Sequence, residues 1–206
     1  MRTILYLSCS PKGPASVCRT FATEVLDRLA KHHPAATVVH RDLAASPPPF
    51  VDADFCSAIL NPQAPADAFP CSEPLIVELE QADAVVIATP MHNYGPPAVL
   101  KAWIDQVVRI HRTFASTPSG KVGQLRDRPV FVVVASGGWF SSPSPGGTPP
   151  QPDFLTPYLR AVLHTIGIHD VHMLLLEGTS RGPDMLRRAV ESARRQLDDP
   201  LPAAVD

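Results

Sequence analysis

Residues 83–114 constrain the fold of this chain more than any other stretch, because they combine a buried strand, a stiff loop and the start of a helix. Residues 83–89 form an almost continuous run of small and β-branched apolar side chains, which is typical of a strand buried on both faces. Pro90 stops this run, and Pro96-Pro97 pre-sets the first turn of a helix. Ligands bind at the carboxyl ends of central strands in doubly wound sheets, so residues 90–95 are a candidate binding loop.

The segment after this loop has the periodicity of an amphipathic helix. Its apolar side chains recur three or four positions apart, which is the spacing of one helical face. The residues on this face are Leu100, Trp103, Ile104, Val107, Val108 and His111. The pattern predicts a helix that packs back onto the sheet.

Strand and helix patterns alternate through the rest of the chain. Further strands are predicted at residues 3–7, 37–41, 130–135 and 171–177, and helices at 16–33, 70–81, 154–166 and 183–197. The connections are a long proline-rich one at 42–69, with one helical turn at 54–60, and loops at 116–128 and 136–152. Five strands alternating with helices predict an α/β fold, a flavodoxin-like doubly wound parallel sheet in the order 2-1-3-4-5 with helices on both faces.

Composition narrows the class of protein. The 206 residues include 45% hydrophobic and 18% charged side chains, as in an ordinary globular protein, and we expect one domain over residues 1–200 with a frayed tail at 201–206. The formal net charge of -2 gives no electrostatic reason to expect nucleic acid or an anionic membrane as a partner. The first apolar run is too short for a secretory signal and no segment spans a bilayer, so a cytoplasmic location is expected.

Cysteine chemistry is not predicted to drive the function. Cys9, Cys18, Cys56 and Cys71 lack the spacing of a metal site or a disulfide scaffold, so reduced thiols are expected. A phosphotyrosine phosphatase of this topology would need an arginine closing the loop after a nucleophilic cysteine, but Ala15 and Ser16 stand there after Cys9. We interpret Cys9 and Cys18 as packing residues.

Two other ligand classes are also disfavoured. The first loop lacks the GxGxxG pattern of a dinucleotide fold. His164, His169 and His172 have no supporting cysteine or carboxylate spacing, so they are interpreted as structural or solvated and no metal is expected.

Three loops follow the carboxyl ends of predicted strands and therefore share one rim of the sheet, at residues 8–16, 90–95 and 136–150. The first offers the hydroxyls of Ser10 and Ser16, the charge of Lys12 and the N–H groups of a helix start, which together suit a phosphate. Each charge-assisted hydrogen bond contributes about 1.5–3 kcal/mol, against about 0.3–1 kcal/mol for the helix end. The same serines could equally serve only as helix caps.

Five segments carry a family resemblance. They are SPKGPASVC at 10–18, RDLAASPPPF at 41–50, TPMHNYGPPAVLKAWIDQVVRIHRTF at 89–114, ASGG at 135–138 and TPYLRAVLHTIGIHDVHMLLLEG at 156–178. These segments resemble the FMN-dependent NADH-azoreductases, in the quinone-reductase branch of flavodoxin-like folds. The resemblance covers nearly the whole chain, and residues 89–114 are its most specific part.

The resemblance implies an FMN site built from the three loops. The family's phosphate loop corresponds to Ser10, Ser16, Val17 and Cys18. Its PMYN loop, whose backbone and asparagine meet the isoalloxazine ring, corresponds to Pro90, Met91, His92 and Asn93, followed by Tyr94. Its glycine pair corresponds to Gly137 and Gly138, preceded by Ser136.

The chain departs from the family pattern at several positions. Cys18 stands where a serine is usual, and Ser116 falls near a tyrosine that often covers the substrate. His92 replaces a tyrosine; its imidazole could tune the flavin or simply fill the space of the ring. The composition of loop 139–152 is also unlike that of typical members, so substrate preference is the least transferable property.

In function, the resemblance implies ping-pong hydride transfer through flavin N5, from NADH or NADPH to a quinone or azo compound, with no catalytic side chain of its own. It also implies a homodimer with flavin sites at the interface. Asn93, Trp139 and Phe140 are candidates for substrate contacts, although core or dimer packing remains an alternative for the two aromatic residues. A non-enzymatic flavodoxin-like redox carrier or flavin-responsive interaction protein is the alternative function.

Overall fold

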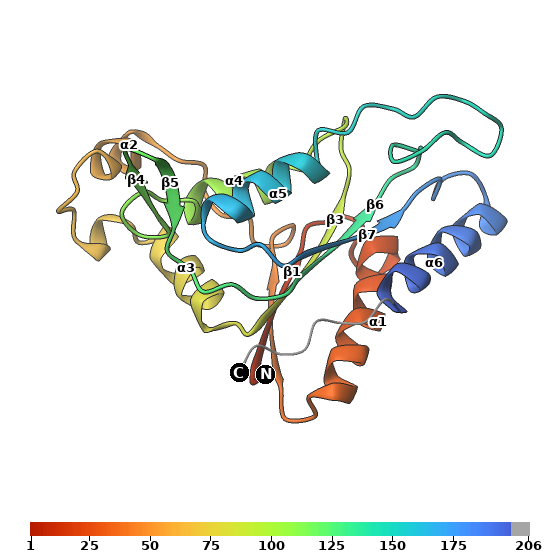
Figure 1. Ribbon diagram of the computed structural model, residues 1–206, viewed down its shortest axis with the longest axis horizontal. Helices are drawn as coiled ribbons and strands as arrows, with labels where there is room; N and C mark the ends of the chain where they lie inside the picture. Colours follow the sequence, from red (N-terminus) through yellow and green to blue (C-terminus); the bar gives the residue numbers. More distant parts are fainter. Residues whose placement is uncertain (199–206) are drawn as a thin grey trace.

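A five-stranded parallel sheet forms the centre of the computed structural model, which describes residues 1–198 (Figure 1). Its strands are β1 (Thr3–Ser8), β2 (Thr37–Asp42), β3 (Ala84–Pro90), β6 (Val130–Ala135) and β7 (Val171–Leu176). They pair in the order β2-β1-β3-β6-β7. This is the 2-1-3-4-5 order predicted from the sequence, and the flavodoxin-like prediction is confirmed.

Helices cover both faces of the sheet, and the alternation of side chains along the strands explains how. On β1, Leu5 and Leu7 belong to one buried cluster, whereas Ile4 and Tyr6 belong to the other. The first cluster packs under α3 (Ser72–Gln81), α4 (Ala98–Val107) and α5 (Thr156–Thr165). The second packs under α1 (Val17–His32) and α6 (Pro183–Asp198), which lie side by side in Figure 1.

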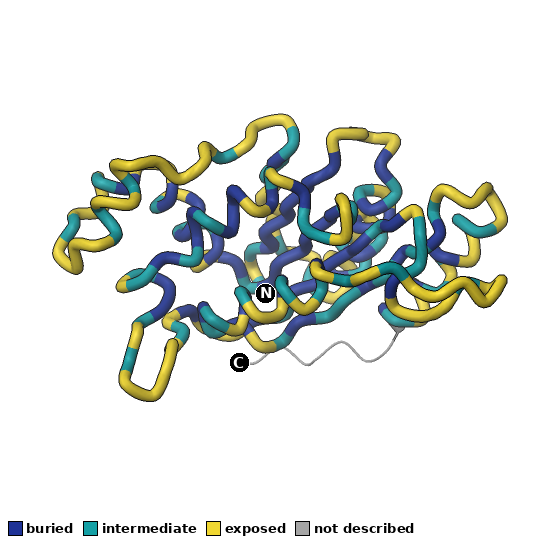
Figure 2. The backbone as a smooth tube through the Cα atoms, turned by 90° about the horizontal axis from the view of Figure 1, so that it is seen from above, coloured by how far each residue is buried: buried dark blue, intermediate teal, exposed yellow. Residues whose placement is uncertain are grey.

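The central strands are buried almost throughout, and the connections lie outside them (Figure 2). Every residue of β3 before Pro90 is buried, which agrees with the apolar run in the sequence. Helix α1 begins where Ser16 accepts a hydrogen bond from the Arg19 N–H, a standard N-terminal cap. The long connection after β2 contains α2 (Ala53–Ile59), close to the single helical turn predicted at 54–60.

Residues 116–128 were predicted to be a loop, and this prediction is wrong for part of the segment. A hairpin forms there from β4 (Phe114–Thr117) and β5 (Gly120–Gly123), a two-stranded antiparallel sheet separate from the main one. Gly123 makes the docking of this hairpin possible, because a Cβ at that position would lie 2.1 Å from the backbone nitrogen of Gly167. The two backbones therefore meet with no side chain between them.

The predicted helical face was too long at its C-terminal end. Helix α4 ends at Val107, because the Thr113 hydroxyl donates a hydrogen bond to the Val107 carbonyl at 2.7 Å and folds the chain back. His111 consequently lies outside the helix, in a left-handed conformation with φ of 67°. The predicted tail at 201–206 and the domain boundary at residue 200 lie outside the described residues.

Candidate functional site

The first loop joins β1 to α1 and contains two buried hydroxyls. Ser10 accepts a hydrogen bond from the Lys12 N–H at 3.3 Å, and Ser16 accepts one from the Arg19 N–H at 3.4 Å. Ser16 therefore caps the helix, whereas Ser10 closes a turn. The Ser10 hydroxyl retains a proton to donate, and so does that of Ser16 when the Cys18 thiol is the donor in their 3.1 Å contact, so capping and anion binding are compatible roles. The N–H groups of Val17 and Cys18 begin the helix, where backbone donors have no carbonyl partner within the helix.

Both cysteines near this loop are packing residues, as the sequence indicated. Cys9 and Cys18 are almost fully buried, and burial raises the pKa of each thiol. The Cys18 sulfur lies 3.1 Å from the Ser16 hydroxyl oxygen, so the thiol packs beneath the first loop. Because both groups stay protonated at neutral pH, neither fits a thiolate nucleophile.

The second loop is a tight turn at the end of β3. His92 and Gly95 exchange two backbone hydrogen bonds of 3.0 Å each, which leaves Asn93 and Tyr94 at the tip. Both tip residues have positive φ, 48° and 71°, as in a type I′ turn. A tyrosine in this region is strained, and such strain collects at ligand sites. The side chains of His92, Asn93 and Tyr94 are all exposed.

The third loop follows β6 and brings its backbone close to neighbouring side chains. The Gly138 N–H donates to the Ser136 hydroxyl at 3.2 Å. A Cβ at Gly138 would lie 2.8 Å from the Gln151 side-chain oxygen, and one at Gly137 would lie 2.5 Å from the Ser180 hydroxyl. A side chain at either glycine would therefore displace Ser180 or Gln151 from its present position.

Hydrogen bonds tie the second loop to the chain on both flanks of the third loop. The Met91 N–H donates to the Ala135 carbonyl at 2.9 Å, and the Phe154 N–H donates to the Tyr94 carbonyl at 2.9 Å. The first loop meets the same rim because the Cys9 N–H donates to the carbonyl of Ala88, near the end of β3. The structure thus brings together the three loops that the sequence predicted, at the carboxyl ends of adjacent strands.

The two candidate aromatic residues have different environments. Phe140 is 6% exposed and packs in the hydrophobic core, which favours the packing alternative over a substrate contact. Trp139 is half-buried, and its ring lies so close to Gly178 that a Cβ there would be 2.6 Å from Cζ2. Of the two, Trp139 remains the substrate-wall candidate.

Two polar residues at this rim were missed by the sequence analysis. Glu177, at the end of β7, accepts hydrogen bonds from the N–H groups of Phe140 and Ser141 at 2.6 Å and 2.9 Å. Gln151 donates to Ser136 from the far end of the long loop. A carboxylate directly after a strand is a weak signal that could have indicated Glu177, whereas nothing marks Gln151 in an irregular segment.

Other polar clusters are structural. In the part of the chain that the structure describes, no group of three or more metal-ligating side chains occurs, and His172 pairs with Asp170 at 2.7 Å. A hollow of about 200 Å³ lies between α2 and the end of α4, away from the three loops. The Arg109 guanidinium at its wall is already paired with Glu73 and stacked 4.1 Å from the Phe69 ring centroid.

Known proteins with similar sequences share one description. The chain is 47% identical over 199 residues to FMN-dependent NADH:quinone oxidoreductase 4 of Pseudomonas fluorescens, covering 96% of this chain and 94% of the relative. It is also 47% identical to FMN-dependent NADH:quinone oxidoreductase 2 of Cupriavidus pinatubonensis, covering 93% of each chain. These relatives extend over nearly the whole sequence.

Solved structures with the same fold include two from Bacillus anthracis. An azoreductase from strain Sterne superposes with a TM-score of 0.78 at 24% identity, covering 95% of this chain and 99% of that chain. An FMN-dependent NADH-azoreductase in complex with FMN gives a TM-score of 0.77 at 22% identity, covering 96% and 98%. At these identities the likeness establishes the fold alone.

The family model that matches this chain is described as a flavodoxin-like fold and covers residues 2–201. Among the helices of residues 1–198, none has the length and apolarity needed to cross a membrane. The match over nearly the whole chain, together with the relatives at 47% identity, agrees with the resemblance found in the sequence. The chain belongs to the flavodoxin-like family that includes the FMN-dependent NADH:quinone oxidoreductases.

Proposed function

We propose that this protein is an FMN-dependent oxidoreductase that uses NADH or NADPH to reduce quinones and azo compounds. The observation that carries the proposal is the meeting of three loops at one rim, with buried hydroxyls and a helix start at one end and an exposed, strained turn at the other. The names of the relatives at 47% identity support the same cofactor and substrate class.

The phosphate of FMN fits the first loop. Ser10 and Ser16 can each donate a hydroxyl proton while accepting a backbone N–H, and the N–H groups of Val17 and Cys18 add further donors. Cys18 replaces a hydroxyl with a thiol, which is a weak donor, but its backbone N–H is unchanged. The cradle of hydroxyl and amide donors therefore supplies most of the anion affinity.

The ring of FMN fits between the second and third loops. The turn at Met91, His92 and Asn93 presents its backbone and one carboxamide, and the pair Gly137 and Gly138 allows backbone to approach a planar ring without a side chain between them. Backbone donors held in place before the reaction stabilise negative charge at low reorganisation cost. These groups would hold the ring and favour electron-rich states of it.

When bound, FMN would supply the redox chemistry, accepting a hydride at N5 from the nicotinamide and passing the electrons to the acceptor in a ping-pong cycle. The chain's own part is to bind, orient and desolvate. Buried Cys9 and Cys18 remain protonated and leave the transfer to the cofactor. Trp139 and Asn93 are the side chains we assign to the substrate wall.

The homodimer implied by the family resemblance is part of the proposal, as is the use of either nicotinamide. Sedimentation of the purified protein tests the dimer. Initial rates with NADH and NADPH at equal concentration decide the preferred donor.

The central test is to add FMN to purified protein and to follow flavin fluorescence, and then NADH oxidation with a benzoquinone acceptor. We expect stoichiometric FMN binding and acceptor-dependent NADH oxidation. A protein that binds FMN but reduces no acceptor without a partner reductase would be a redox carrier. A colourless protein that leaves the fluorescence of added FMN unchanged would exclude both functions.

A further inference from the structure

Gln151 is the side chain that joins the second and third loops of the site. Its side-chain nitrogen Nε2 lies 3.0 Å from the Ser136 hydroxyl oxygen and 3.4 Å from the Met91 sulfur. Its side-chain oxygen faces the backbone of Gly138. One carboxamide therefore touches three residues that the family resemblance assigns to the flavin ring.

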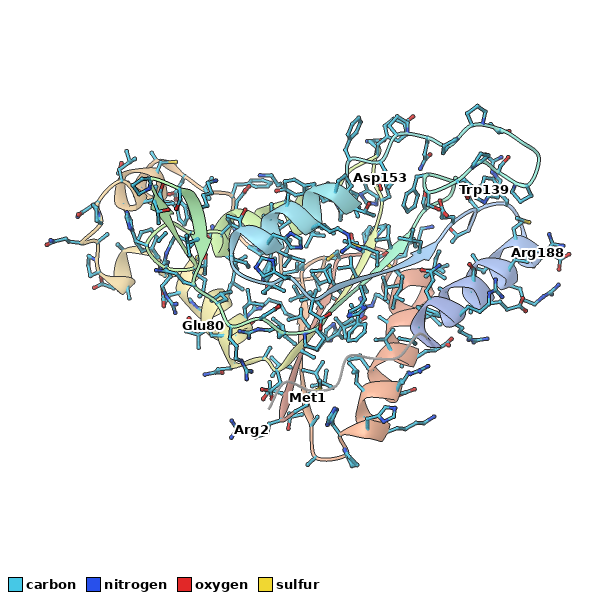
Figure 3. All side chains as sticks on the ribbon, in the orientation of Figure 1. Met1, Arg2, Glu80, Trp139, Asp153 and Arg188 are labelled. Atoms are coloured by element: carbon cyan, nitrogen blue, oxygen red, sulfur yellow. The ribbon has the colours of Figure 1, made fainter. Side chains whose placement is uncertain are left out.

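The position of Gln151 is fixed on both sides. Its own N–H donates to the Trp139 carbonyl at 2.8 Å, which closes the long loop onto its first residues. Two residues later, the Asp153 carboxylate accepts hydrogen bonds from the N–H groups of Leu155 and Thr156, at 2.9 Å each, and so fixes the start of α5. Figure 3 shows Trp139 and Asp153 near the two ends of this loop, at the rim of the sheet. The backbone on both sides of the carboxamide is consequently fixed, and the carboxamide itself is held by Ser136 and Met91.

The hydrogen bonds around Ser136 give this arrangement a chemical consequence. The Ser136 oxygen accepts the Gly138 N–H at 3.2 Å and the Gln151 amide at 3.0 Å. A hydroxyl oxygen has two acceptor sites, so both are filled and only its proton remains for a third partner. Ser136 is thus a fixed donor, and a donor at a flavin ring edge stabilises negative charge there.

We propose that Gln151 is a positioning residue for the flavin ring, because it fixes the Ser136 hydroxyl as a donor and holds the Met91 loop against Gly138. This inference rests on the proposed function, since it concerns the same FMN site. It assigns a role to the irregular loop 139–152, whose last part places Gln151 at the ring end of the site.

The test replaces Gln151 by methionine, which has nearly the same length and cannot donate a hydrogen bond. We expect the dissociation constant for FMN to rise about tenfold, as for the loss of one or two hydrogen bonds. Riboflavin, which has the ring but no phosphate, should lose affinity by the same factor. The Ser16→Ala variant provides the contrast, because it should weaken FMN binding and leave riboflavin binding unchanged.

A second variant, Gln151→Glu, has the same shape but places a carboxylate beside Ser136. It should lower the reduction potential of bound FMN, by about 30 mV for each tenfold by which binding of the reduced form weakens more than that of the oxidised form. The matched control is Gln81→Met on an exposed position at the end of α3, near the opposite end of the sheet, which should change neither affinity nor potential.

The outcomes separate the two proposals. Wild-type protein that binds neither FMN nor riboflavin contradicts the proposed function and this inference with it. Wild-type binding with unchanged constants in Gln151→Met contradicts the inference alone. A Gln151→Met protein that melts earlier without flavin, yet binds both flavins normally, would assign Gln151 to fold stability and overturn the positioning role.

Discussion

At the scale of single residues, Tyr94 combines an unfavourable backbone conformation with a place in the proposed flavin site. Its φ of 71° costs a residue with a side chain about 1 kcal/mol or more, whereas glycine adopts this region freely. Tyr94 is 45% exposed, so removal of its ring costs less buried area than removal of a core aromatic residue would. We predict that Tyr94→Gly raises the free energy of unfolding by about 0.5–1 kcal/mol, measured in urea.

The control for this prediction is Tyr94→Ala, which removes the same ring but keeps the strained conformation. It should give no gain in stability. If alanine and glycine are equally stable at this position, the strain does not contribute. A weaker FMN affinity in both variants would show that Tyr94 contributes to FMN binding although its conformation lowers the stability of the fold.

Asp83 provides a pH-dependent contribution at the start of β3. Burial by itself would raise the pKa of this carboxyl, but hydrogen bonds from the N–H groups of Arg2 and Thr3, with help from Arg126, lower the pKa to about 2. The carboxylate therefore stabilises the fold above the unfolded pKa of 3.8, and this contribution disappears as the pH falls towards 2.

We predict that Asp83→Asn lowers the free energy of unfolding by about 2 kcal/mol at pH 7, and that the difference nearly vanishes at pH 2. Urea unfolding at pH 7, 5, 3 and 2 measures it. Asp67→Asn, at an exposed position before α3, should have little effect at any pH. An equal loss at pH 7 and pH 2 would mean that the asparagine disturbs packing and not charge.

At the scale of elements, the hairpin β4–β5 depends on the contact between Gly123 and Gly167. A methyl group on Gly123 would overlap the backbone of Gly167 and Ile166, at 2.1 Å and 2.4 Å from the nearest atoms. Backbone cannot move aside as a flexible side chain does, so we predict that Gly123→Ala lowers the free energy of unfolding by about 2 kcal/mol. Limited proteolysis should then cut the hairpin at its turn.

The matched control is Gly146→Ala in the exposed loop, where the nearest atom to a new Cβ is 3.8 Å away. It should leave both stability and proteolysis unchanged. A Gly123→Ala protein that is as stable and as resistant to proteolysis as the Gly146→Ala protein would mean that the contact between the hairpin and Gly167 does not contribute to the free energy of unfolding.

Sequence patterns predicted the main elements because burial on both faces leaves a clear trace. The strands β3 and β6 are continuous apolar runs, and both were placed to within a residue. The hairpin was not predicted, because its two strands have four residues each, rich in Ala, Ser and Gly, with no alternation of apolar and polar side chains. The end of α4 at Val107 was not predicted either, because it depends on a hydrogen bond from the hydroxyl of Thr113, six residues after the Val107 carbonyl.

At the scale of the whole molecule, the candidate site could be located from topology and not completed from it. Parallel strands place the loops after β1, β3 and β6 at one rim, so those loops were predictable once the strand order was known. The role of Gln151 was not predictable, because its side chain reaches Ser136 and Met91 only when the irregular loop before it folds back on itself. Its contacts depend on three-dimensional closure and not on a local pattern.

The two faces of the sheet share the same strands, so we predict that the chain unfolds as one cooperative unit over the predicted domain of residues 1–200. Trp103 is buried in the cluster under α4 and reports on one face, and α1 and α6 cover the other. In a Trp139→Phe variant, the fluorescence of Trp103 and the far-ultraviolet circular dichroism should therefore report unfolding at the same temperature.

FMN at about 100 times its dissociation constant adds about 2.7 kcal/mol to the free energy of unfolding and should raise both transition temperatures together, by about 5–10 °C. Inorganic phosphate should raise them far less, because it engages the phosphate end of the site alone. Transitions that separate, or an FMN shift confined to one signal, would mean that the two faces unfold independently and that the site does not couple them.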